Sequence, residues 1–324
     1  MILIDRTETD PFFNIAAEEY VLKAFNEDVF MLWINGPSVI IGKHQVATAE
    51  ADIMYTWKNN IPVIRRISGG GTVYHDKGNL NYSLVVNGKK GKLVDYKKYS
   101  STVIRALKSL SLSAALEGKS NLVVNGLKFS GNAEHVHRNR VLHHGTLLFD
   151  SDLVTLRKCI RPQHPGYVDR SIRSDDSKIS NLKALLPNGT VMQDFRNAIL
   201  KQIKDDFPGI INYQFSTEDD RKIRELVQQK YGKMDWNFGY SPSYKVERKF
   251  FVGSKQFELM LKTEKGVIAE MIISVNGEEV QNDISQMLIN KLHHPHVIKD
   301  VLLSTKFALL KKQISPDTFI SGLF

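Results

Sequence analysis

Three consecutive glycines at positions 69–71 separate two apolar runs and limit the folds that this chain can adopt. Residues 61–64 and 72–76 each have the composition of a short strand, so the triplet falls in the turn between two strands. Because glycine has no Cβ, consecutive N–H groups of such a turn can point at one bound group. Arg65 and Arg66 add positive charge beside it, and the stretch therefore predicts a site for a phosphate or a carboxylate.

The same triplet has a plainer interpretation. In most proteins, three glycines in a row form a flexible hairpin turn. The two common nucleotide-binding fingerprints are absent from this stretch, because no Gly-x-Gly-x-x-Gly opens a helix and no Gly-Lys-Ser/Thr ending follows. A dinucleotide-binding fold and a P-loop are therefore excluded by spacing, and the flanking residues must decide between a turn and a site.

Polar residues also occur on predicted strands farther along the chain. An Asn-Gly dipeptide predicts a hairpin turn at residues 125–126, and Lys128 follows it directly, where a lysine is usually a solvated edge residue. Residues 142–150 predict another strand, and neighbouring side chains on a strand point to opposite faces. His143 and His144 therefore cannot both face one pocket.

Capping signals place several helices. An apolar repeat led by proline predicts a helix over residues 11–26. Thr190 with Gln193, and Ser216 with Asp219, have the spacing of capping boxes that open two later helices. Further strands are predicted over residues 30–34, 38–41 and 80–86, the first two joined by a turn.

The pattern of the chain changes near residue 247. Apolar residues then alternate along two predicted strands, and helices are predicted near residues 282–292 and 297–310. We therefore expect two domains, a larger one of residues 1–246 and a small α+β domain of residues 247–324. A monomer is expected.

Charge and composition exclude several classes of protein. The net charge of +9 favours an acidic partner, but the basic residues are dispersed and lack aromatic interleaving, so no nucleic-acid partner is expected. Since no apolar run approaches the roughly 20 residues of a membrane span, no membrane association is expected. The N-terminus lacks a basic region followed by an apolar stretch, which predicts a cytoplasmic location. Cys159 is the single cysteine, which excludes an internal disulfide bond.

Three motifs resemble the signature segments of the lipoate-protein ligase A family, in the family's order and spacing. Weaker similarity runs across nearly the whole chain. The motifs read Arg66-x-Ser68-Gly69-Gly70-Gly71-Thr72-Val73-Tyr74-His75-Asp76-x-Gly78-Asn79, then Asn125-Gly126-Leu127-Lys128-Phe129-Ser130-Gly131-Asn132-Ala133, then His143-His144-Gly145-Thr146-Leu147-Leu148.

The resemblance implies a fold and an activity. The fold would be α/β with mixed sheets, a large catalytic domain of the biotin/lipoate ligase type followed by a small α+β domain. The activity would be a two-step acyl transfer, in which lipoate reacts with ATP to give lipoyl-adenylate and the lipoyl group then passes to a lysine. ATP with Mg²⁺ and lipoate would be substrates, with no permanently bound cofactor. The acceptors would be lipoyl domains of E2 subunits or the glycine cleavage H protein.

The resemblance also implies roles for individual residues. Lys128 would be the catalytic residue, bridging the carboxylate and the α-phosphate. No metal ligand is assigned, because this chain has Ser120 and Asn121 where the family commonly has Asn-Asp, which leaves Asn121 as a weak contact at most. The residues implied to bind ATP or lipoate are Arg66, Ser68, Gly69, Gly70, Gly71, Thr72, Val73, Tyr74, His75, Asn79, Lys128, Ser130, Gly131 and His144.

Related functions remain open at this point. A lipoyltransferase that accepts preformed lipoyl-adenylate shares all these motifs. An octanoyltransferase of the same fold would need a cysteine nucleophile shortly before the lysine motif, and residues 113–119 contain none. A biotin ligase differs in its glycine loop, and a non-catalytic binding module is the alternative outside catalysis. The polar segment 159–185 is expected to cover the site.

Overall fold

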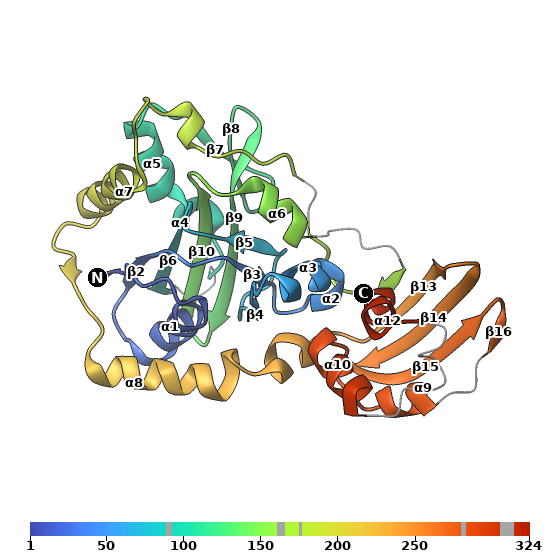
Figure 1. The fold of residues 1–324 in the computed structure, drawn as a ribbon. Coiled ribbons are helices and arrows are strands. Elements are labelled where there is room, and N and C mark those ends of the chain that lie inside the picture. The colour runs from blue at the N-terminus through green and yellow to red at the C-terminus, as the bar shows by residue number, and fades with distance from the viewer. Residues whose placement is uncertain (89–92, 161–165, 175–176, 280–282, 305–313) are drawn as a thin grey trace.

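The computed structural model describes residues 1–88, 93–160, 166–174, 177–279, 283–304 and 314–324. It contains an eight-stranded mixed sheet, a three-stranded sheet and a five-stranded antiparallel sheet (Figure 1). The first two sheets lie in the N-terminal part, and the third is formed mainly by the C-terminal part. The predicted mixed α/β class is confirmed.

The eight-stranded sheet is the centre of the N-terminal part. Its strand order is β12-β1-β2-β6-β10-β9-β8-β7, in which β1 pairs in parallel with β12 and β2 and the other neighbours are antiparallel. The strands are β1 (Ile2–Asp5), β2 (Val29–Trp33), β6 (Asn79–Asn87), β7 (Ala114–Glu117), β8 (Asn121–Val124), β9 (Leu127–His137), β10 (Arg140–Leu148) and β12 (Ile211–Asn212).

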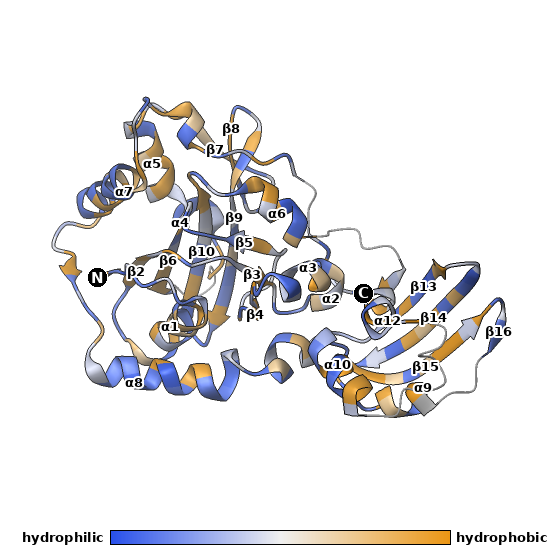
Figure 2. Ribbon diagram, in the orientation of Figure 1, coloured by the Kyte–Doolittle hydropathy of each residue, from blue (hydrophilic) through white to orange (hydrophobic). Residues whose placement is uncertain are grey.

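Helices cover both faces of this sheet. On β2, Met31 and Trp33 pack with α1 (Pro11–Ala24), whereas Phe30 and Leu32 pack on the opposite face toward α5 (Ser101–Ser109) and α7 (Met192–Asp206). Because both faces are covered, β2 is apolar along its whole length. The neighbouring β6 and β10 also carry buried polar residues, among them Asn81 and His144. By contrast, the outer helix α8 (Thr217–Leu226) is largely hydrophilic, as Figure 2 shows.

Two of the three helix starts lie where the sequence predicts them. The helix α1 begins at Pro11, and the Asp10 carboxylate accepts from the N–H of Phe12 at 2.9 Å. Ser216 and Asp219 form the predicted capping box, with Ser216 Oγ accepting from the Asp219 N–H at 3.1 Å. Both helix starts are confirmed.

The capping box predicted at Thr190 and Gln193 is wrong by one residue. Val191 is the cap of α7, and the Asp194 carboxylate accepts from the Val191 N–H at 3.0 Å. The Thr190 hydroxyl instead donates to the carbonyl of Pro187 at 2.7 Å. The Asp194 carboxylate therefore caps the helix start one residue after the predicted position.

The three-stranded sheet carries the glycine triplet. Its middle strand β3 (Ser38–Ile41) lies between β4 (Val63–Arg65) and β5 (Val73–His75), and the triplet joins β4 to β5. Residues 30–34 and 38–41 form strands as predicted. However, β2 and β3 belong to different sheets, so the turn between them carries the chain from the large sheet to the small one. The short helices α2 (Ala47–Glu50) and α3 (Ile53–Lys58) follow β3.

The C-terminal sheet has the order β11-β13-β14-β15-β16. Its first strand, β11 (Tyr167–Asp169), comes from the N-terminal part and pairs with β13. The other strands are β13 (Tyr244–Val252), β14 (Lys255–Glu264), β15 (Val267–Val275) and β16 (Glu278–Glu279), followed by α9 (Asp283–Leu288), α10 (Pro295–Ser304) and α12 (Pro316–Leu323). The two predicted C-terminal helices correspond to α9 and α10, and residue 282 and residues 305–310 of those predictions lie outside the described residues.

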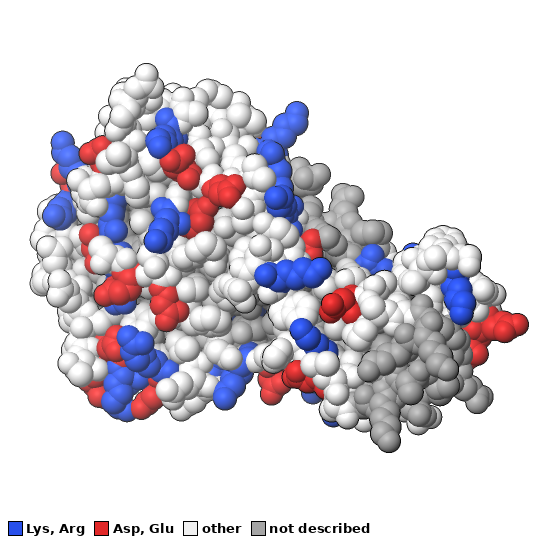
Figure 3. Space-filling view, viewed as in Figure 1, with Lys and Arg blue, Asp and Glu red and all other residues white. Residues whose placement is uncertain are grey.

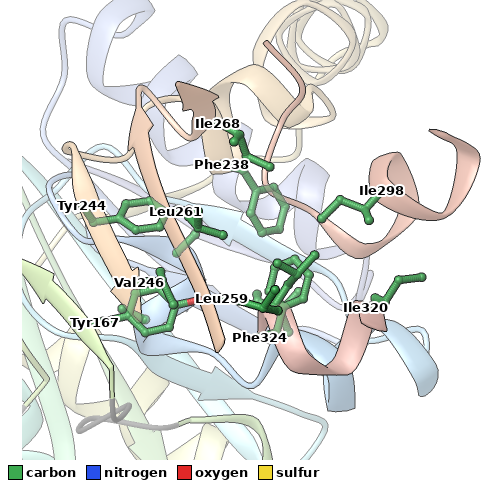
Figure 4. Close-up of a cluster of buried hydrophobic side chains, with 14 of the residues drawn as sticks. Tyr167, Phe238, Tyr244, Val246, Leu259, Leu261, Ile268, Ile298, Ile320 and Phe324 are labelled. Atoms are coloured by element: carbon green, nitrogen blue, oxygen red, sulfur yellow. The ribbon is translucent and has the colours of Figure 1, made fainter. Parts of the chain in front are cut away.

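A single apolar cluster joins the C-terminal sheet to the N-terminal part. Figure 4 shows Tyr167 and Phe238 packed beside Tyr244, Leu259 and Phe324 of the C-terminal part. The same cluster continues into β3, α2 and α3. The two parts of the chain therefore share a hydrophobic contact in this structure.

Two expectations from the sequence concern a membrane span and a nucleic-acid partner, and the helices and the surface charge bear on them. No helix in the described ranges is long and apolar enough to cross a membrane. On the face shown in Figure 3, acidic and basic side chains are intermingled over the large sheet and its helices. The net positive charge is therefore not gathered into one broad patch on this face.

Candidate active site

The glycine loop, residues 66–72, has the turn that the sequence predicts. Gly70 has a φ of +84°, a conformation that side chains with a Cβ rarely adopt. A Cβ on Gly71 would lie 3.2 Å from Cα of Ser174, whereas Gly69 has open space around it. Glycine is therefore favoured at position 70 by its conformation and at position 71 by the close approach of Ser174.

Arg66 holds this loop in place from the inside. Its Nη2 donates to the carbonyl oxygens of Gly69 at 2.6 Å and Gly71 at 2.8 Å. Its Nη1 donates to the carbonyl of Ile40 at 3.1 Å, and its Nε donates to Ser68 Oγ at 2.9 Å. Burial lowers the pKa of Arg66 to about 10, so the guanidinium stays charged at neutral pH. The charge expected beside the triplet is present, and it also fixes the shape of the loop.

Arg65 points away from the loop, which corrects the expectation that both arginines place positive charge beside the glycine triplet. Its Nη1 donates to three carbonyl oxygens of residues 42–45, at 2.7 to 3.0 Å. Its Nη2 donates to the Asn237 carbonyl and to Ser241 Oγ, both at 2.9 Å, and its Nε donates to the Trp236 carbonyl at 3.1 Å. Burial lowers the pKa of Arg65 to about 9. Arg65 therefore ties β4 to the segment that precedes β13.

Residues 172–174 lie over the glycine loop. Ser174 Oγ accepts from the Thr72 N–H at 2.8 Å and donates to the Glu50 carboxylate, which also accepts from the Ser174 N–H at 3.1 Å. Burial raises the pKa of Glu50. This part of the polar segment 159–185 occupies the covering position that the sequence predicts.

Lys128 lies on β9, just after the turn at residues 125–126. Both turn residues have positive φ, 53° and 72°, as in a tight two-residue hairpin. The backbone of Lys128 is bonded on both sides to the covering segment, donating to the carbonyl of Lys178 at 2.9 Å and accepting from the N–H of Ser180 at 3.0 Å. A Cβ on Gly131 would lie 3.5 Å from Lys128 Cε, so the glycine leaves room for the lysine side chain.

Two cavities meet at Lys128. The first, of about 280 Å³, has an apolar end formed by Ile15, Trp33 and Ile40. The second, of about 670 Å³, includes the basic residues Arg157, at the end of α6 (Leu153–Cys159), and Lys178. Both cavities are lined by Thr72, Val73, Lys128, Gly131, Thr146 and Ser174.

The structure brings most of the predicted site residues together around these cavities. The first cavity is lined by Arg66, Gly70, Gly71, Thr72, Val73, His75, Asn121, Lys128, Gly131 and His144. The second is lined by Thr72, Val73, Tyr74, Lys128, Ser130 and Gly131. Ser68, Gly69 and Asn79 line neither cavity. Ser68 and Asn79 are buried, and Asn79 donates to Asn81 Oδ1 at 2.8 Å, whereas Gly69 has open space around it.

The histidines on β10 point to opposite faces of the large sheet, as predicted. His144 lines the first cavity, and its Nε2 lies 2.6 Å from Ser68 Oγ. His143 contacts Tyr82 OH at 3.1 Å and Glu134 Oε1 at 2.9 Å on the other face. Of the two histidines, only His144 is therefore a candidate for contact with a substrate.

His75 is a neutral residue of the cavity wall. Its Nδ1 lies 3.0 Å from Asn35 Nδ2. Burial, together with the charge of Arg66, lowers the pKa of His75 to about 3. The ring therefore offers hydrogen bonds at neutral pH and no positive charge.

Sequence reasoning missed the apolar end of the first cavity and the carboxylate beneath it. Ile15 and Glu18 lie on α1, which was predicted as a helix with no part in the site. One signal could have found Glu18, because Glu18 and Glu19 interrupt an otherwise apolar stretch and a buried charge requires partners. Both carboxylates are buried in the structure.

The described residues contain no group of three or more His, Cys, Asp or Glu side chains that could hold a metal ion. Ser120 and Asn121, where the ligase motif commonly carries an acidic residue, both line the first cavity. Any metal ion at the site would therefore have to be held largely by the ligand that it accompanies.

The chain belongs to the lipoyl protein ligase A/B family. The family model "Lipoyl protein ligase A/B catalytic domain" matches residues 10–204. The lipoate-protein ligase LplJ of Bacillus subtilis is 32% identical over an alignment of 333 residues that covers 100% of both chains. Lipoate–protein ligase 1 of Staphylococcus aureus is 34% identical and covers 91% of this chain and 90% of its own.

Solved structures have the same fold. An archaeal bi-partite lipoate protein ligase from Thermoplasma acidophilum, studied with its E2 lipoyl domain, has a TM-score of 0.65 at 24% identity and covers 74% of this chain and 96% of its own. A lipoate-protein ligase A bound with ATP has a TM-score of 0.63 at 24% identity, covering 74% and 98%. P. falciparum LipL1 in complex with lipoate has a TM-score of 0.62 at 20% identity, covering 99% and 98%.

Proposed function

We propose that the protein is an ATP-dependent lipoate–protein ligase that forms lipoyl-adenylate and transfers the lipoyl group to a lysine of an acceptor domain. The observation that carries the proposal is the position of Lys128, which lines both cavities where they meet. A carboxylate in one cavity and a phosphate in the other would meet at this ammonium group. Relatives named as lipoate-protein ligases over the full chain support the same activity.

In the first step, a lipoate carboxylate oxygen attacks the α-phosphorus of ATP, and the bond to the β-phosphate oxygen breaks to release pyrophosphate. Negative charge develops on phosphoryl oxygens, so fixed cations and N–H donors lower the barrier. Lys128 supplies the charge between the two reacting groups, and the loop at Gly70 to Thr72 forms the wall beside it. The apolar end at Ile15, Trp33 and Ile40 suits the acyl chain and its ring.

In the second step, the ε-amine of an acceptor lysine attacks the carbonyl carbon of the mixed anhydride, and AMP leaves. The amine must lose a proton, which desolvation in a cleft favours. Lys128 stays with the developing carbonyl oxygen, and no dedicated base is assigned. The acceptors proposed are lipoyl domains of E2 subunits or the glycine cleavage H protein, in keeping with the E2 lipoyl domain studied with the archaeal protein.

The environment of Cys159 disfavours an octanoyltransferase. The thiol is fully buried in the apolar cluster beside α2 and α3. Burial raises the pKa of Cys159 to about 12, so a thiolate nucleophile would be scarce at neutral pH. An acyl–enzyme intermediate on this chain is therefore not proposed.

We propose that magnesium enters as part of the MgATP substrate. Mg²⁺ keeps several waters and is commonly held through substrate phosphates with one or two protein oxygens. Asn121, in the wall of the first cavity, is the candidate for a weak contact of this kind.

We also propose that residues 1–246 form the catalytic domain and residues 247–324 an accessory domain. The archaeal and ATP-bound structures each cover 74% of this chain, and residues 1–246 are about the same share of it. The shared apolar cluster provides a contact between the two domains, and the Glu247 N–H donates to the Gly166 carbonyl at 3.0 Å across the proposed boundary. Native-state hydrogen exchange tests the division, because residues 247–324 should open as one unit.

The activity is tested by incubating the protein with α-³²P-labelled ATP, lipoate and no acceptor. A ligase should accumulate labelled lipoyl-adenylate and release pyrophosphate only when lipoate is present. Addition of a lipoyl domain should then discharge AMP and leave the domain lipoylated. Transfer from synthetic lipoyl-adenylate without any product from ATP would show a lipoyltransferase instead, and no transfer from either donor would leave a non-catalytic module.

A further inference from the structure

A chain of buried hydrogen bonds runs from α1 to the glycine loop behind the first cavity. Glu18 Oε1 lies 2.8 Å from His144 Nδ1, and His144 Nε2 lies 2.6 Å from Ser68 Oγ. Ser68 Oγ accepts from Arg66 Nε at 2.9 Å. Ser83 adds a donor to Glu18 Oε1 at 2.6 Å. Three elements distant in the sequence, α1, β6 and β10, are thereby joined to Arg66, the residue that holds the loop.

In this hydrogen-bond chain, every donor has an acceptor when each group donates toward Glu18. The Arg66 Nε–H can only donate, so Ser68 Oγ accepts from it and directs its own hydrogen to His144 Nε2. His144 then carries its hydrogen on Nδ1 and donates it to the Glu18 carboxylate. With the other tautomer, both His144 and Arg66 would donate to Ser68. The serine hydrogen would then lose its acceptor in the chain, at a cost expected for a buried polar group.

The chain also joins two buried charges. Arg66 donates to three carbonyl oxygens and one hydroxyl, which are neutral acceptors. Glu18 is 1% exposed and accepts from Ser83 and His144. A buried guanidinium and a buried carboxylate stabilise one another through a low-dielectric interior, even when polar groups lie between them.

We propose that Glu18 is a positioning residue for the ligase reaction, acting through His144 and Ser68 on Arg66 and thereby on the Gly69–Gly71 carbonyls of the substrate-binding loop. The inference rests on the proposed function for the meaning of the loop. The hydrogen-bond chain itself does not depend on that function, because it is formed by side chains of the protein without a substrate.

The Ser68, His144 and Glu18 side chains have the order of a hydrolase triad, but their environment disagrees with nucleophilic catalysis. Ser68 is fully buried, lines neither cavity and accepts from Arg66. A serine nucleophile must reach the substrate carbon and have its oxygen free to attack. The chain therefore orients the loop and forms no covalent intermediate.

The neighbouring carboxylate provides a matched control. Glu19 is 3% exposed on the same helix, yet its partners are Lys23, Lys230 and Tyr231. Substitution of either glutamate removes a buried acceptor from α1. Only the substitution at Glu18 should change the orientation of His144.

The test compares Glu18→Met, Glu18→Gln and Glu19→Met in lipoate-dependent pyrophosphate release by the full chain. Methionine removes the acceptor, whereas glutamine keeps an oxygen that can still accept from His144. Displacing a loop by about 1 Å can cost 100-fold in rate, so Glu18→Met should lower kcat/KM by about 100-fold. Glu18→Gln should recover at least tenfold of that loss. The kcat/KM of Glu19→Met should stay within about threefold of wild type, because Glu19 has only a structural role.

A second measurement is independent of activity. In ¹⁵N-histidine-labelled protein, with the His144 signals assigned by their loss in His144→Ala, His144 should carry its hydrogen on Nδ1 in the wild type and in Glu18→Gln. In Glu18→Met it should shift toward the Nε2–H tautomer. Equal rate losses for Glu18→Met and Glu19→Met, or an unchanged His144 tautomer in folded Glu18→Met, would overturn the proposal. If the wild type makes no adenylate, the proposed function fails while the tautomer comparison still decides whether the chain exists.

Discussion

The cavities lie between two walls, one formed by the glycine loop (residues 66–72) and the other by β8 and β9. Cationic side chains have a structural role at the first wall and a proposed catalytic role at the second. Beside the glycine loop, Arg65 and Arg66 donate to backbone carbonyls and so fix the surrounding chain, and of the two only Arg66 lines a cavity. On the β8–β9 wall, Lys128 extends over Gly131 to a place where two cavities meet. Arginine suits the first task because its planar fork can donate to several fixed oxygens at once, and a lysine ammonium suits a mobile reacting group.

The difference shows that positive charge in a motif does not by itself mark a catalytic residue. What decides the role is where the fold places the cation, inside a set of backbone carbonyls or in the walls of the cavities. Arg65 donates to acceptors contributed by residues 42–45 and 236–241. The comparison predicts that Lys128 contributes mostly to rate, that Arg65 contributes mostly to stability, and that Arg66 contributes to both.

The largest effect is expected for Lys128→Ala. Removing one charge aimed at the reacting groups in a dry site commonly costs 100- to 1,000-fold in rate, and lipoate-dependent pyrophosphate release should fall by about that factor. The free energy of unfolding in urea should stay within about 0.5 kcal/mol of wild type, as for most partly exposed positions. A near-normal rate in the folded variant would remove Lys128 from the proposed mechanism and erase the contrast between the walls.

The opposite pattern is expected for Arg65→Lys. A lysine at this position cannot reach all the carbonyl oxygens that the guanidinium bonds, and unpaired buried groups should lower the free energy of unfolding by about 3 kcal/mol. At a temperature where the variant is folded, its kcat/KM should lie within about threefold of wild type. Urea unfolding and pyrophosphate release on the same preparation measure both quantities. A large rate loss without a stability loss would show that Arg65 belongs to the site after all.

Gly70→Ala is expected to have a smaller effect than either cation. Its φ of +84° is unfavourable for alanine, and the added methyl group would lie 3.1 Å from Arg66 Nη2. We expect a loss of about 1–2 kcal/mol in the free energy of unfolding, together with weaker binding of lipoate by calorimetry. Gly69→Ala is the matched control, because nothing lies within 4 Å of its added methyl group. If both substitutions behave alike, the triplet is only a flexible turn.

The sequence was informative wherever a feature is decided by near neighbours. The loop between two strands, the start of α1 at Pro11 and the opposite directions of His143 and His144 all follow from local patterns. The start of α7 was missed by one residue because Thr190 and Asp194 are competing polar groups a few positions apart.

The direction of each arginine could not be read from the sequence. Arg65 and Arg66 are adjacent and chemically identical, and they differ only in which carbonyls the fold brings near them. The same holds for Glu18, whose partner His144 is 126 positions away. Features that depend on acceptors from distant segments require the structure, whereas the motifs alone indicate that a site is present.

The smallest expected effect concerns Ser174, which lies over the glycine-loop wall. Its hydroxyl accepts from the Thr72 N–H and donates to the buried Glu50 carboxylate, so it joins the covering segment to the loop. Ser174→Ala should lower the free energy of unfolding by about 1 kcal/mol, a value that includes the lost hydrogen bond and the unpaired Thr72 N–H.

The pKa of Glu50, already raised by burial, should rise further when the hydroxyl donor is lost. Because the folded-state pKa of this carboxylate is raised, its protonated form is favoured in the folded protein. Its ionisation therefore costs stability as the pH rises through the unfolded pKa, and Ser174→Ala should make that loss larger.

Ser171→Ala provides the control, since within the described residues the buried Ser171 hydroxyl has no hydrogen-bond partner. Its removal should be neutral or slightly stabilising, because a buried unpaired hydroxyl is itself unfavourable. Urea unfolding of the two variants at pH 4, near the unfolded pKa of a glutamate, and at pH 8 measures the difference. If Ser174→Ala is as neutral as Ser171→Ala at both pH values, the covering segment is not held by this hydroxyl. The glycine loop would then be stabilised by Arg66 without a contribution from the covering segment. The structural role of the arginine would contrast more clearly with the proposed catalytic role of Lys128.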